Sequence, residues 1–251
     1  MQWIMSTLLE GYTDAVDMDK KWTTTELSVA RAHLAGAATG NIIMFAGGDG
    51  DSEYYDVVDI FDISKKDIVH TVKHLSYGLR RLAGAAAGNV IMFAGGEDNH
   101  HVFPSGSKIV YIYNILDMSM TIKELSEGRH DLAAAGTKDR IIFFGGGQSS
   151  TAEIFDINNF SRTTSKVSEE RGYTAGAALD DYIVFFGGGE TKVADIYTVS
   201  TGKWTQQTVS QSIDMDLTAA ASGNKILFAG GSVNAGFHNP TKKVEIFTVI
   251  K

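Results

Sequence analysis

Three arginines occupy equivalent places in repeated stretches of this chain. Arg31 opens RAHLAG, Arg129 opens RHDLAA and Arg171 opens RGYTAG. A guanidinium group can bind a carboxylate or a phosphate through two parallel hydrogen bonds. These residues are therefore candidates for holding an anionic ligand. The alternative is that each pairs with a carboxylate of a neighbouring repeat, and both roles stay open.

A second set of residues differs in chemistry between repeats whose framework is constant. The residue just before the repeated Leu or Thr is, in chain order, His33, Arg81, Asp131, Tyr173 and Asp216. At the arginine position the two remaining repeats carry Leu79 and Asp214. A ring of unlike side chains suits an asymmetric ligand. Asp131, Asp214 and Asp216 are also the carboxylates with which the arginines could pair.

Metal binding is not the favoured interpretation of the other polar clusters. Residues 49–56 space carboxylates like a calcium loop, but glycine is missing at the sixth place and glutamate at the twelfth. A solvated acidic loop fits better. His100 and His101 are adjacent, and neighbours on an extended chain point to opposite sides. We expect no metal and no cofactor.

Signatures of catalysis are absent from the sequence. There is no G-x-S-x-G, no H-E-x-x-H and no phosphate loop. Asp214 and Asp216 could form the acid and base of a glycosidase, although both occupy ordinary repeat positions. We expect a protein that is not an enzyme, and a propeller enzyme acting on a sugar is an alternative.

The framework that positions these residues is a fivefold repeat. Similar segments of small residues, a turn, an apolar run and a double glycine begin at Leu34, Leu82, Leu132, Thr174 and Leu217. Their starts lie 48, 50, 42 and 43 residues apart. A period of about 40–50 residues indicates a repeat architecture.

One repeat contains four predicted strands. In the second repeat they cover residues 82–87, 90–94, 109–115 and 121–125, and Gly88-Asn89 is a hairpin signal. Four antiparallel strands form one propeller blade. We expect one all-β domain over residues 1–251, a five-bladed propeller with blades from about 28, 76, 126, 168 and 210 and the small-residue strands innermost.

The N-terminal segment is predicted to complete the last blade. The fifth repeat stops after its third strand, and residues 20–28 (KKWTTTELS) match residues 202–210 (GKWTQQTVS) in the fourth repeat. Residues 15–28 would thus form the missing strand and protect two sheet edges, after an irregular stretch over 1–14. The alternative is a fragment of a longer array.

From about residue 15 to residue 251 the chain resembles the kelch repeat family. The matching features are the aromatic third strands, Trp22, Trp204 and the double glycines that begin at Gly47, Gly95, Gly145, Gly187 and Gly230. Only two fourth strands keep the tryptophan, and six or seven blades are commoner in that family. The resemblance implies that Arg31, Arg129 and Arg171 line a partner-binding mouth.

Strand-one entries and the loops between strands two and three open on the same face of such a blade. Tyr54, Tyr55, His100 and Phe103 lie in those loops and are further candidates for ligand contact. We expect a non-catalytic recognition module that binds a protein or an acidic peptide at the rim. A carbohydrate-binding lectin that uses rim aromatics and carboxylates is the alternative.

Composition narrows the class of partner. The net charge of −8 argues against nucleic acid and anionic membranes as partners. No apolar run reaches the roughly 18 residues of a membrane span. With no cysteine and no recognisable signal peptide, we expect a cytoplasmic protein, and a monomer is favoured.

Overall fold

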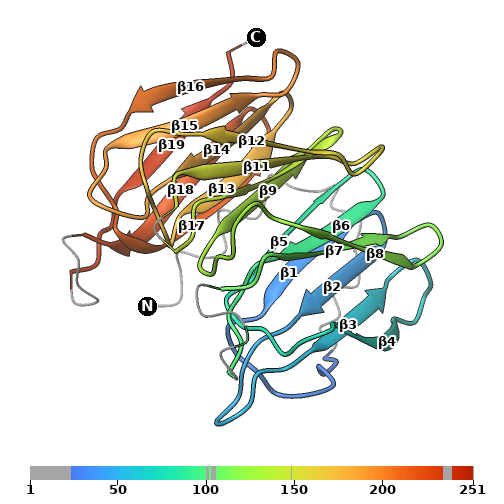
Figure 1. Ribbon diagram of the computed structural model, residues 1–251. Coiled ribbons are helices and arrows are strands. Elements are labelled where there is room, and N and C mark those ends of the chain that lie inside the picture. Colours follow the sequence, from blue (N-terminus) through green and yellow to red (C-terminus); the bar gives the residue numbers. More distant parts are fainter. Residues whose placement is uncertain (1–23, 100–101, 103–105, 148, 234–238, 251) are drawn as a thin grey trace, which may run out of the picture.

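The computed structural model describes residues 24–99, 102, 106–147, 149–233 and 239–250, and all its regular elements are strands. In these residues nineteen strands form five antiparallel sheets that follow one another along the chain (Figure 1). None of the described residues belongs to a helix that is long and apolar enough to cross a membrane. The expectation of an all-β chain is confirmed.

Within the described residues, each of the first four sheets contains four strands in sequence order, and the fifth contains three. The first sheet comprises β1 (Ala35–Thr39), β2 (Ile42–Ala46), β3 (Val57–Asp62) and β4 (Val69–His74). The second comprises β5 (Ala83–Ala87), β6 (Val90–Ala94), β7 (Ile109–Asn114) and β8 (Ser119–Glu124). The third comprises β9 (Ala133–Thr137), β10 (Arg140–Phe144), β11 (Thr151–Asp156) and β12 (Arg162–Lys166). The fourth comprises β13 (Ala175–Leu179), β14 (Tyr182–Phe186), β15 (Val193–Thr198) and β16 (Lys203–Thr208), and the fifth comprises β17 (Met215–Ser222), β18 (Lys225–Ser232) and β19 (Val244–Thr248).

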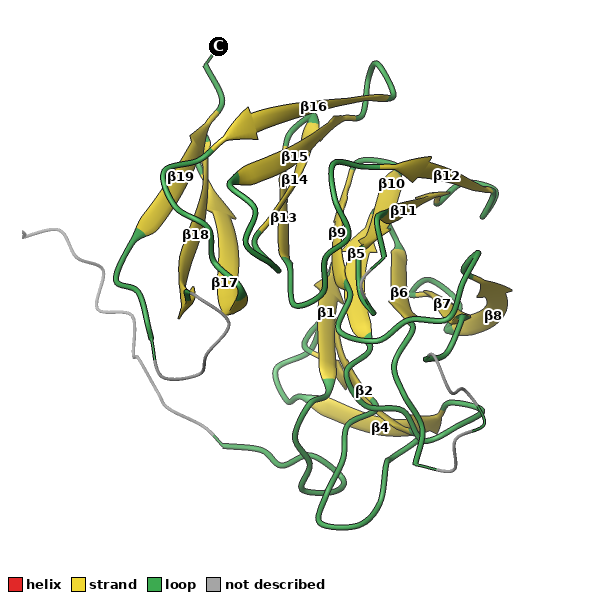
Figure 2. Ribbon diagram, turned by 60° about the vertical axis from the view of Figure 1, so that its left-hand side comes forward, coloured by secondary structure: helices red, strands yellow, loops and turns green. Residues whose placement is uncertain are grey.

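The sheets pack face to face around their first strands. Contacts between sheets join β1 to β5, β5 to β9, β9 to β13 and β13 to β17. Figure 2 shows these strands at the middle of the molecule and β4, β8, β12 and β16 at its outside. Alanine and glycine dominate the first strands, which lets neighbouring backbones approach closely. The arrangement is that of a propeller-like all-β fold.

Four apolar clusters hold successive sheets together. In one of them Met44 and Ile60 of the first sheet pack with Phe93 and Tyr113 of the second, and all four side chains are buried. Successive side chains of a strand point to opposite faces of its sheet, so one set of apolar side chains packs on the preceding sheet and the other set packs on the following sheet. Within the described residues no such cluster joins the fifth sheet to the first.

The double glycines are required by the packing of one repeat against the next. Gly48 has φ 106°, and a Cβ there would lie 2.5 Å from the Ala32 carbonyl oxygen. A Cβ on Gly47 would lie 2.4 Å from the Leu79 carbonyl oxygen, which accepts a hydrogen bond from the Gly48 amide at 2.8 Å. Any side chain would separate the second strand from the entry segment of the following sheet.

A serine before each first strand ties the entry segment to the third strand of the sheet that follows. The backbone amide donates in four repeats: Ser28 N to Asp59 Oδ1 at 2.9 Å, Ser76 N to Tyr111 Oη at 3.1 Å, Ser126 N to Glu153 Oε1 at 2.7 Å and Ser210 N to Glu245 Oε1 at 3.0 Å. The hydroxyl groups of Ser126 and Ser210 donate to the same carboxylates, and in the fourth repeat the Ser168 hydroxyl donates to Asp195 Oδ2 at 2.7 Å. Four of these serines follow the fourth strand of the preceding sheet. Ser28 makes the same contact, although no fourth strand is described before it.

The segment expected to complete the fifth sheet lies mostly outside the described residues. Residues 1–23, which include Trp22, are not among them, and residues 24–28 form no strand. In the part of the chain that the structure describes, β19 has a partner on one side only. Strand addition by the N-terminal segment therefore stays a prediction.

Candidate functional site

The five residues that come directly before the repeated Leu or Thr lie around one cavity. His33, Arg81, Asp131, Tyr173 and Asp216 line a space of about 280 Å³, together with the Leu or Thr that follows each of them. We call this cavity the mouth. The repeat pattern predicted that these positions converge, and every one of the five sheets contributes to the cavity. Their role in binding a ligand stays a prediction.

The backbone at the mouth is strained in the same way in every repeat. The five residues have φ between 51° and 62°, a left-handed backbone conformation that residues other than glycine rarely adopt. Three backbone hydrogen bonds join four of them in a row: Arg81 N to His33 O at 3.0 Å, Asp131 N to Arg81 O at 3.1 Å and Tyr173 N to Asp131 O at 3.0 Å. The fold thus fixes both the place and the direction of these residues.

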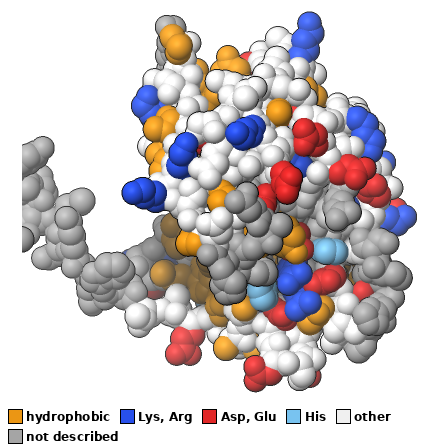
Figure 3. Space-filling view, turned by 90° about the vertical axis from the view of Figure 1, so that its left-hand side faces the viewer, with side chains coloured by type: hydrophobic (Ala, Val, Ile, Leu, Met, Phe, Trp, Pro, Cys, Tyr) orange, Lys and Arg blue, Asp and Glu red, His pale blue; other side chains and the backbone are white. Residues whose placement is uncertain are grey.

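Side chains of both signs form a connected chain along one part of the mouth. Asp49 lies 2.7 Å from His33 Nδ1 and 2.9 Å from Arg80 Nη1. Arg80 Nε also donates to Glu97 at 2.7 Å. On the face shown in Figure 3, basic, acidic and histidine side chains gather in one area. No pattern in the sequence indicated that Arg80, Glu97 and Asp49 would form this network.

Arg81 continues the chain of charges towards the third sheet. Its Nη1 lies 3.7 Å from Glu97 and 3.5 Å from Asp131, and Asp131 lies 2.7 Å from His130 Nδ1. Arg80 and Arg81 are therefore shared among the carboxylates of Asp49, Glu97 and Asp131. The only signal for Arg80 in the sequence was its place beside Arg81.

These contacts change the pKa values of the mouth residues. Burial opposes the ionisation of Asp49, but hydrogen bonds from His33 and Arg80 outweigh it and lower the pKa of Asp49. The hydrogen bond to Asp131 raises the pKa of His130. Burial, with the Asp131 carboxylate beside it, raises the pKa of Tyr173. Asp49 therefore stays ionised and Tyr173 stays a neutral phenol at neutral pH.

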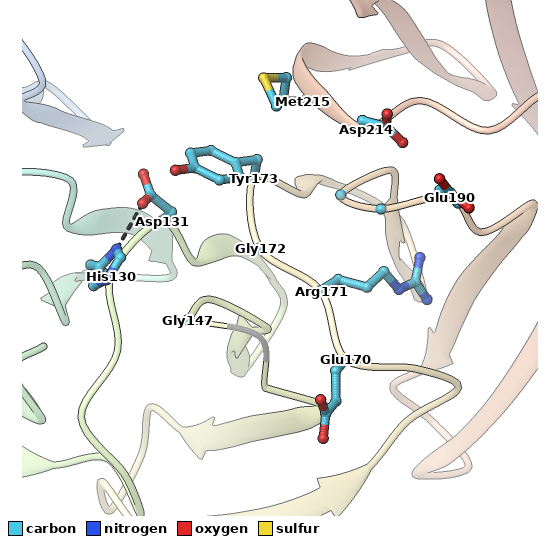
Figure 4. Close-up of a pocket in the computed structure, with 12 residues that line it drawn as sticks. His130, Asp131, Gly147, Glu170, Arg171, Gly172, Tyr173, Glu190, Asp214 and Met215 are labelled. Carbon is cyan, nitrogen blue, oxygen red and sulfur yellow. Dashed lines mark hydrogen bonds and ion pairs between the residues drawn. The ribbon is translucent and has the colours of Figure 1, made fainter. Parts of the chain in front are cut away.

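A larger pocket of about 470 Å³ adjoins the mouth between the third, fourth and fifth sheets (Figure 4). It shares Asp131 and Tyr173 with the mouth. Glu170, Glu190 and Asp214 add carboxylates from the fourth and fifth sheets, and Met215 adds an apolar surface. Figure 4 shows the Arg171 guanidinium directed away from Tyr173 and Asp131. Four carboxylates thus line the pocket, and its described basic lining residues are His130 and the buried Arg171, so acidic groups predominate.

The three entry arginines do not line the mouth, where the sequence placed them, although Arg171 lines the adjoining pocket. Their side chains are at most 1% exposed and pair with the carboxylate of the third strand in the same sheet: Arg31 with Asp59 at 2.6 Å, Arg129 with Glu153 at 3.1 Å, and Arg171 with Asp195. Burial lowers the pKa of Arg129, and it lowers that of Arg171 to about 10. The partners are also not the carboxylates of neighbouring repeats that the sequence suggested.

Asp214 does not correspond to the entry arginines. The Gly48, Gly96 and Gly146 amides bond to the carbonyl groups of Leu79, Arg129 and Arg171, and the Gly188 amide bonds to Ile213. Ile213 is therefore the structural equivalent, and the fifth repeat has one additional residue before Asp216. Asp214 instead lies in the adjoining pocket, 7% exposed.

The loop residues are only partly described. Tyr54 lies beneath the Arg80 guanidinium, 4.5 Å from ring centre to Cζ, and the backbone of Tyr55 bonds to Gly48 and Leu79. His100 and Phe103 lie outside the described residues. Among the residues that the structure describes, no group of three or more histidine or acidic side chains could hold a metal ion.

No protein-family model matches the chain, and a search of curated proteins finds no significant relative.

Proposed function

We propose that this chain is a five-bladed, kelch-like β-propeller that acts as a non-catalytic recognition module. The recognition role is supported by the backbone conformation of the five residues at the mouth. Left-handed backbone costs about 1–2 kcal/mol for a residue with a side chain, and glycine would avoid that cost. Five equivalent positions nevertheless carry His, Arg, Asp, Tyr and Asp. Strain repeated at one cavity, with unlike side chains, is typical of a binding site.

Closure of the propeller by the N-terminal segment is part of this proposal. Ser28 bonds to Asp59 as the four serines that follow a fourth strand bond to their partners. The chain therefore enters the first sheet from the place where a fourth strand of the fifth sheet would end. The similarity between residues 20–28 and 202–210 supplies the strand itself.

Exposed apolar residues on the fifth sheet support the same closure. Leu227, Val244 and Ile246 are 39%, 46% and 56% exposed. Their counterparts in the first sheet are Met44, Val58 and Ile60, which are at most 2% exposed because the second sheet covers them. The first sheet would cover the fifth in the same manner once the ring is closed.

The charges at the mouth favour a protein segment that carries a basic side chain. The arginines that suggested an acidic partner are buried, and Arg80 and Arg81 are already shared among Asp49, Glu97 and Asp131. Asp216 at the mouth is exposed, and the adjoining pocket adds further carboxylates. A lysine or arginine of the partner would enter between Asp131, Tyr173 and Asp216.

Display selection with random peptides tests the proposal. The full chain should enrich peptides that contain Lys or Arg. The variant Asp131→Asn/Asp216→Asn should bind these peptides with an affinity at least about tenfold lower, because each charged hydrogen bond contributes roughly 1.5–3 kcal/mol. Leu116→Ala, at an exposed turn, is the matched control and should bind as the parent does. Failure to enrich any peptide, or equal binding by the mouth variant, would overturn the proposal.

A further inference from the structure

A separate cavity of about 530 Å³ lies between the second and third sheets, beside their outer strands β8 and β12. Lys108, Lys123 and Glu124 line it from the second sheet, and Phe160 and Arg162 line it from the third. None of its described lining residues borders the mouth or the pocket beside the mouth. The volume is within the range of about 300–1,000 Å³ that is usual for small-molecule sites. We call this space the outer cavity.

Strand pairing directs one cation from each sheet into the outer cavity. Lys123 is opposite Val110 on β7, and Arg162 is opposite Phe155 on β11. Residues directly opposite each other lie on the same face of a sheet. Val110 and Phe155 belong to the apolar cluster that joins the second sheet to the third. The side chains of Lys123 and Arg162 therefore lie on the two sheet faces that meet there.

The space is open because an arginine takes the place that a tryptophan has in the next sheet. Trp204 is opposite Tyr197 in the fourth sheet, as Arg162 is opposite Phe155 in the third. Trp204 packs between the third and fourth sheets, with its ring centre 6.1 Å from that of Phe144 on β10. Arg162 is instead exposed, and the corresponding space between the second and third sheets remains as the outer cavity.

The outer cavity has a surplus of positive charge, although the net charge of the chain is −8. Lys108 lies 3.2 Å from Glu124, and both side chains are at least half exposed, so this pair is weak. Lys123 has no ion-pair partner among the described residues. With Arg162, three cations thus face the single carboxylate of the described lining, which leaves two positive charges unbalanced.

Arg162 keeps a hydrogen-bond donor for a ligand. Its Nη1 donates to the Glu124 carbonyl at 2.8 Å, and its Nε lies 3.5 Å from Glu153, whose nearer cation is Arg129 at 3.1 Å. These contacts hold the guanidinium in place and leave Nη2 available. Ser161, the preceding residue, also lines the cavity and adds a hydroxyl group.

We propose that the outer cavity binds a phosphate monoester that carries an aromatic group. Such a phosphate has about 1.5–2 negative charges at neutral pH, which matches the surplus, whereas a carboxylate has one. Guanidinium and ammonium groups form strong, charge-assisted hydrogen bonds with phosphate oxygens. Leu125 and Phe160 give the cavity an apolar wall against which an aromatic ring can pack.

Calorimetric titration of the full chain with phenyl phosphate tests the proposal. Phenyl phosphate should bind, while inorganic phosphate and benzyl alcohol, which each present one half of the ligand, should bind at least about tenfold more weakly. Lys123→Gln should weaken the binding of phenyl phosphate by at least about tenfold, because a charged hydrogen bond is lost. This substitution is at an exposed position, so the variant should fold as the parent does.

Lys73→Gln is the matched control for the loss of charge. Lys73 is opposite Val58 in the first sheet, as Lys123 is opposite Val110 in the second, and its ammonium donates to the Met118 carbonyl at 2.6 Å. Lys73→Gln should bind phenyl phosphate with the affinity of the parent. An equal loss in both variants would mean that only the overall charge matters, and it would overturn the proposal.

A further variant removes the space instead of a charge. Arg162→Trp copies Trp204, and it should fill the outer cavity and abolish binding. Thermal unfolding shows whether this variant is folded, and if it is not, Lys123→Gln decides alone. The proposal fails if phenyl phosphate does not bind, if inorganic phosphate binds as tightly, or if folded Arg162→Trp binds like the parent. Binding of hexaglutamate in place of phenyl phosphate would also overturn it and would indicate an acidic protein segment.

The outer cavity and the mouth can be tested independently. Asp131→Asn/Asp216→Asn should bind phenyl phosphate with unchanged affinity, and Lys123→Gln should still bind the selected basic peptides. Because each ligand is measured separately, failure of the peptide experiment leaves the phosphate site unaffected, and the reverse also holds.

Discussion

The Arg129 guanidinium lies 3.1 Å from the Glu153 carboxylate, and both side chains are excluded from solvent. Arg129 also donates to the carbonyl groups of Gly145 at 2.9 Å and Thr151 at 2.7 Å. One side chain thus ties the entry of the third sheet to its second and third strands. In the second sheet the corresponding residues are Leu79 and Tyr111, so the entry segment is joined to the third strand without an ion pair.

We predict that Arg129→Leu lowers the free energy of unfolding by about 3 kcal/mol, because the buried Glu153 would lose its nearer cation and keep only Arg162, at 3.5 Å. The double variant Arg129→Leu/Glu153→Tyr, which copies the second sheet, should recover most of that loss. Urea denaturation of the parent and the two variants measures both effects. A single variant as stable as the parent would show that the ion pair is not needed in the fold.

Two buried tyrosines of β7 offer a matched pair. The Tyr113 hydroxyl is buried without a hydrogen-bond partner, whereas the Tyr111 hydroxyl accepts a hydrogen bond from the Ser76 amide at 3.1 Å. Tyr113→Phe should therefore stabilise the protein by about 1 kcal/mol, and Tyr111→Phe should destabilise it by a similar amount. Thermal unfolding of both variants tests the difference. The same sign of change in both would contradict this reading of the hydrogen bonds.

Strand positions could be predicted from the sequence because they depend on local patterns. The apolar run at Val90–Ala94 follows a Gly-Asn turn and forms β6 with those bounds. The partners of the arginines depend instead on which face of the third strand each side chain takes, which only the packed sheet decides. A signal for them did exist. Arg31, Arg129 and Arg171 occur in the repeats that carry Asp59, Glu153 and Asp195, and Leu79 accompanies Tyr111, whereas the fifth repeat combines Ile213 with Glu245.

The sequence indicated which residues line the mouth but not which ion pairs form there. Its five residues were found because they vary on a constant framework, and all of them line the cavity. The ion pairs of Arg80 with Asp49 and Glu97 join residues from different loops, and no repeat spacing indicates such contacts. The one-residue insertion before Asp216 was missed because counting back from Leu217 assumes equal lengths.

Ring closure predicts a strong effect at Ile246. This side chain is 56% exposed in the described structure, but closure would bury it against the first sheet. Ile246→Asp should then destabilise the protein by more than about 2 kcal/mol. Ile122→Asp, at a 47% exposed position on the outer strand β8, is the control and should change stability by less than about 0.5 kcal/mol. Equal, small effects in denaturant titrations would argue for an open ring.

The hydrogen bond between His130 and Asp131 predicts a dependence of stability on pH. The pKa of His130 is raised above its ordinary value of 6.5, so its contribution is fully present below that value and is lost as the pH rises through the higher, folded-state value. The stability difference between the parent and His130→Gln should therefore shrink between about pH 5 and about pH 8. NMR titration should show that Asp131→Asn lowers the pKa of His130. An unchanged pKa in that variant would contradict the assignment.

Two substitutions of Asp216 separate the backbone strain at this residue from the effect of its carboxylate. Its φ is 62°, and both Asp216→Gly and Asp216→Ala remove the carboxylate. A left-handed alanine costs about 1–2 kcal/mol, and glycine loses about 0.5–1 kcal/mol through its freedom in the unfolded chain, so the glycine variant should be the more stable by roughly 0.5–1 kcal/mol. Denaturant titration measures this difference, and both variants should bind the selected basic peptides equally weakly. If the alanine variant is as stable as the glycine variant and both bind like the parent, Asp216 is neither strained nor in contact with the ligand, and the mouth loses the feature on which its assignment depends.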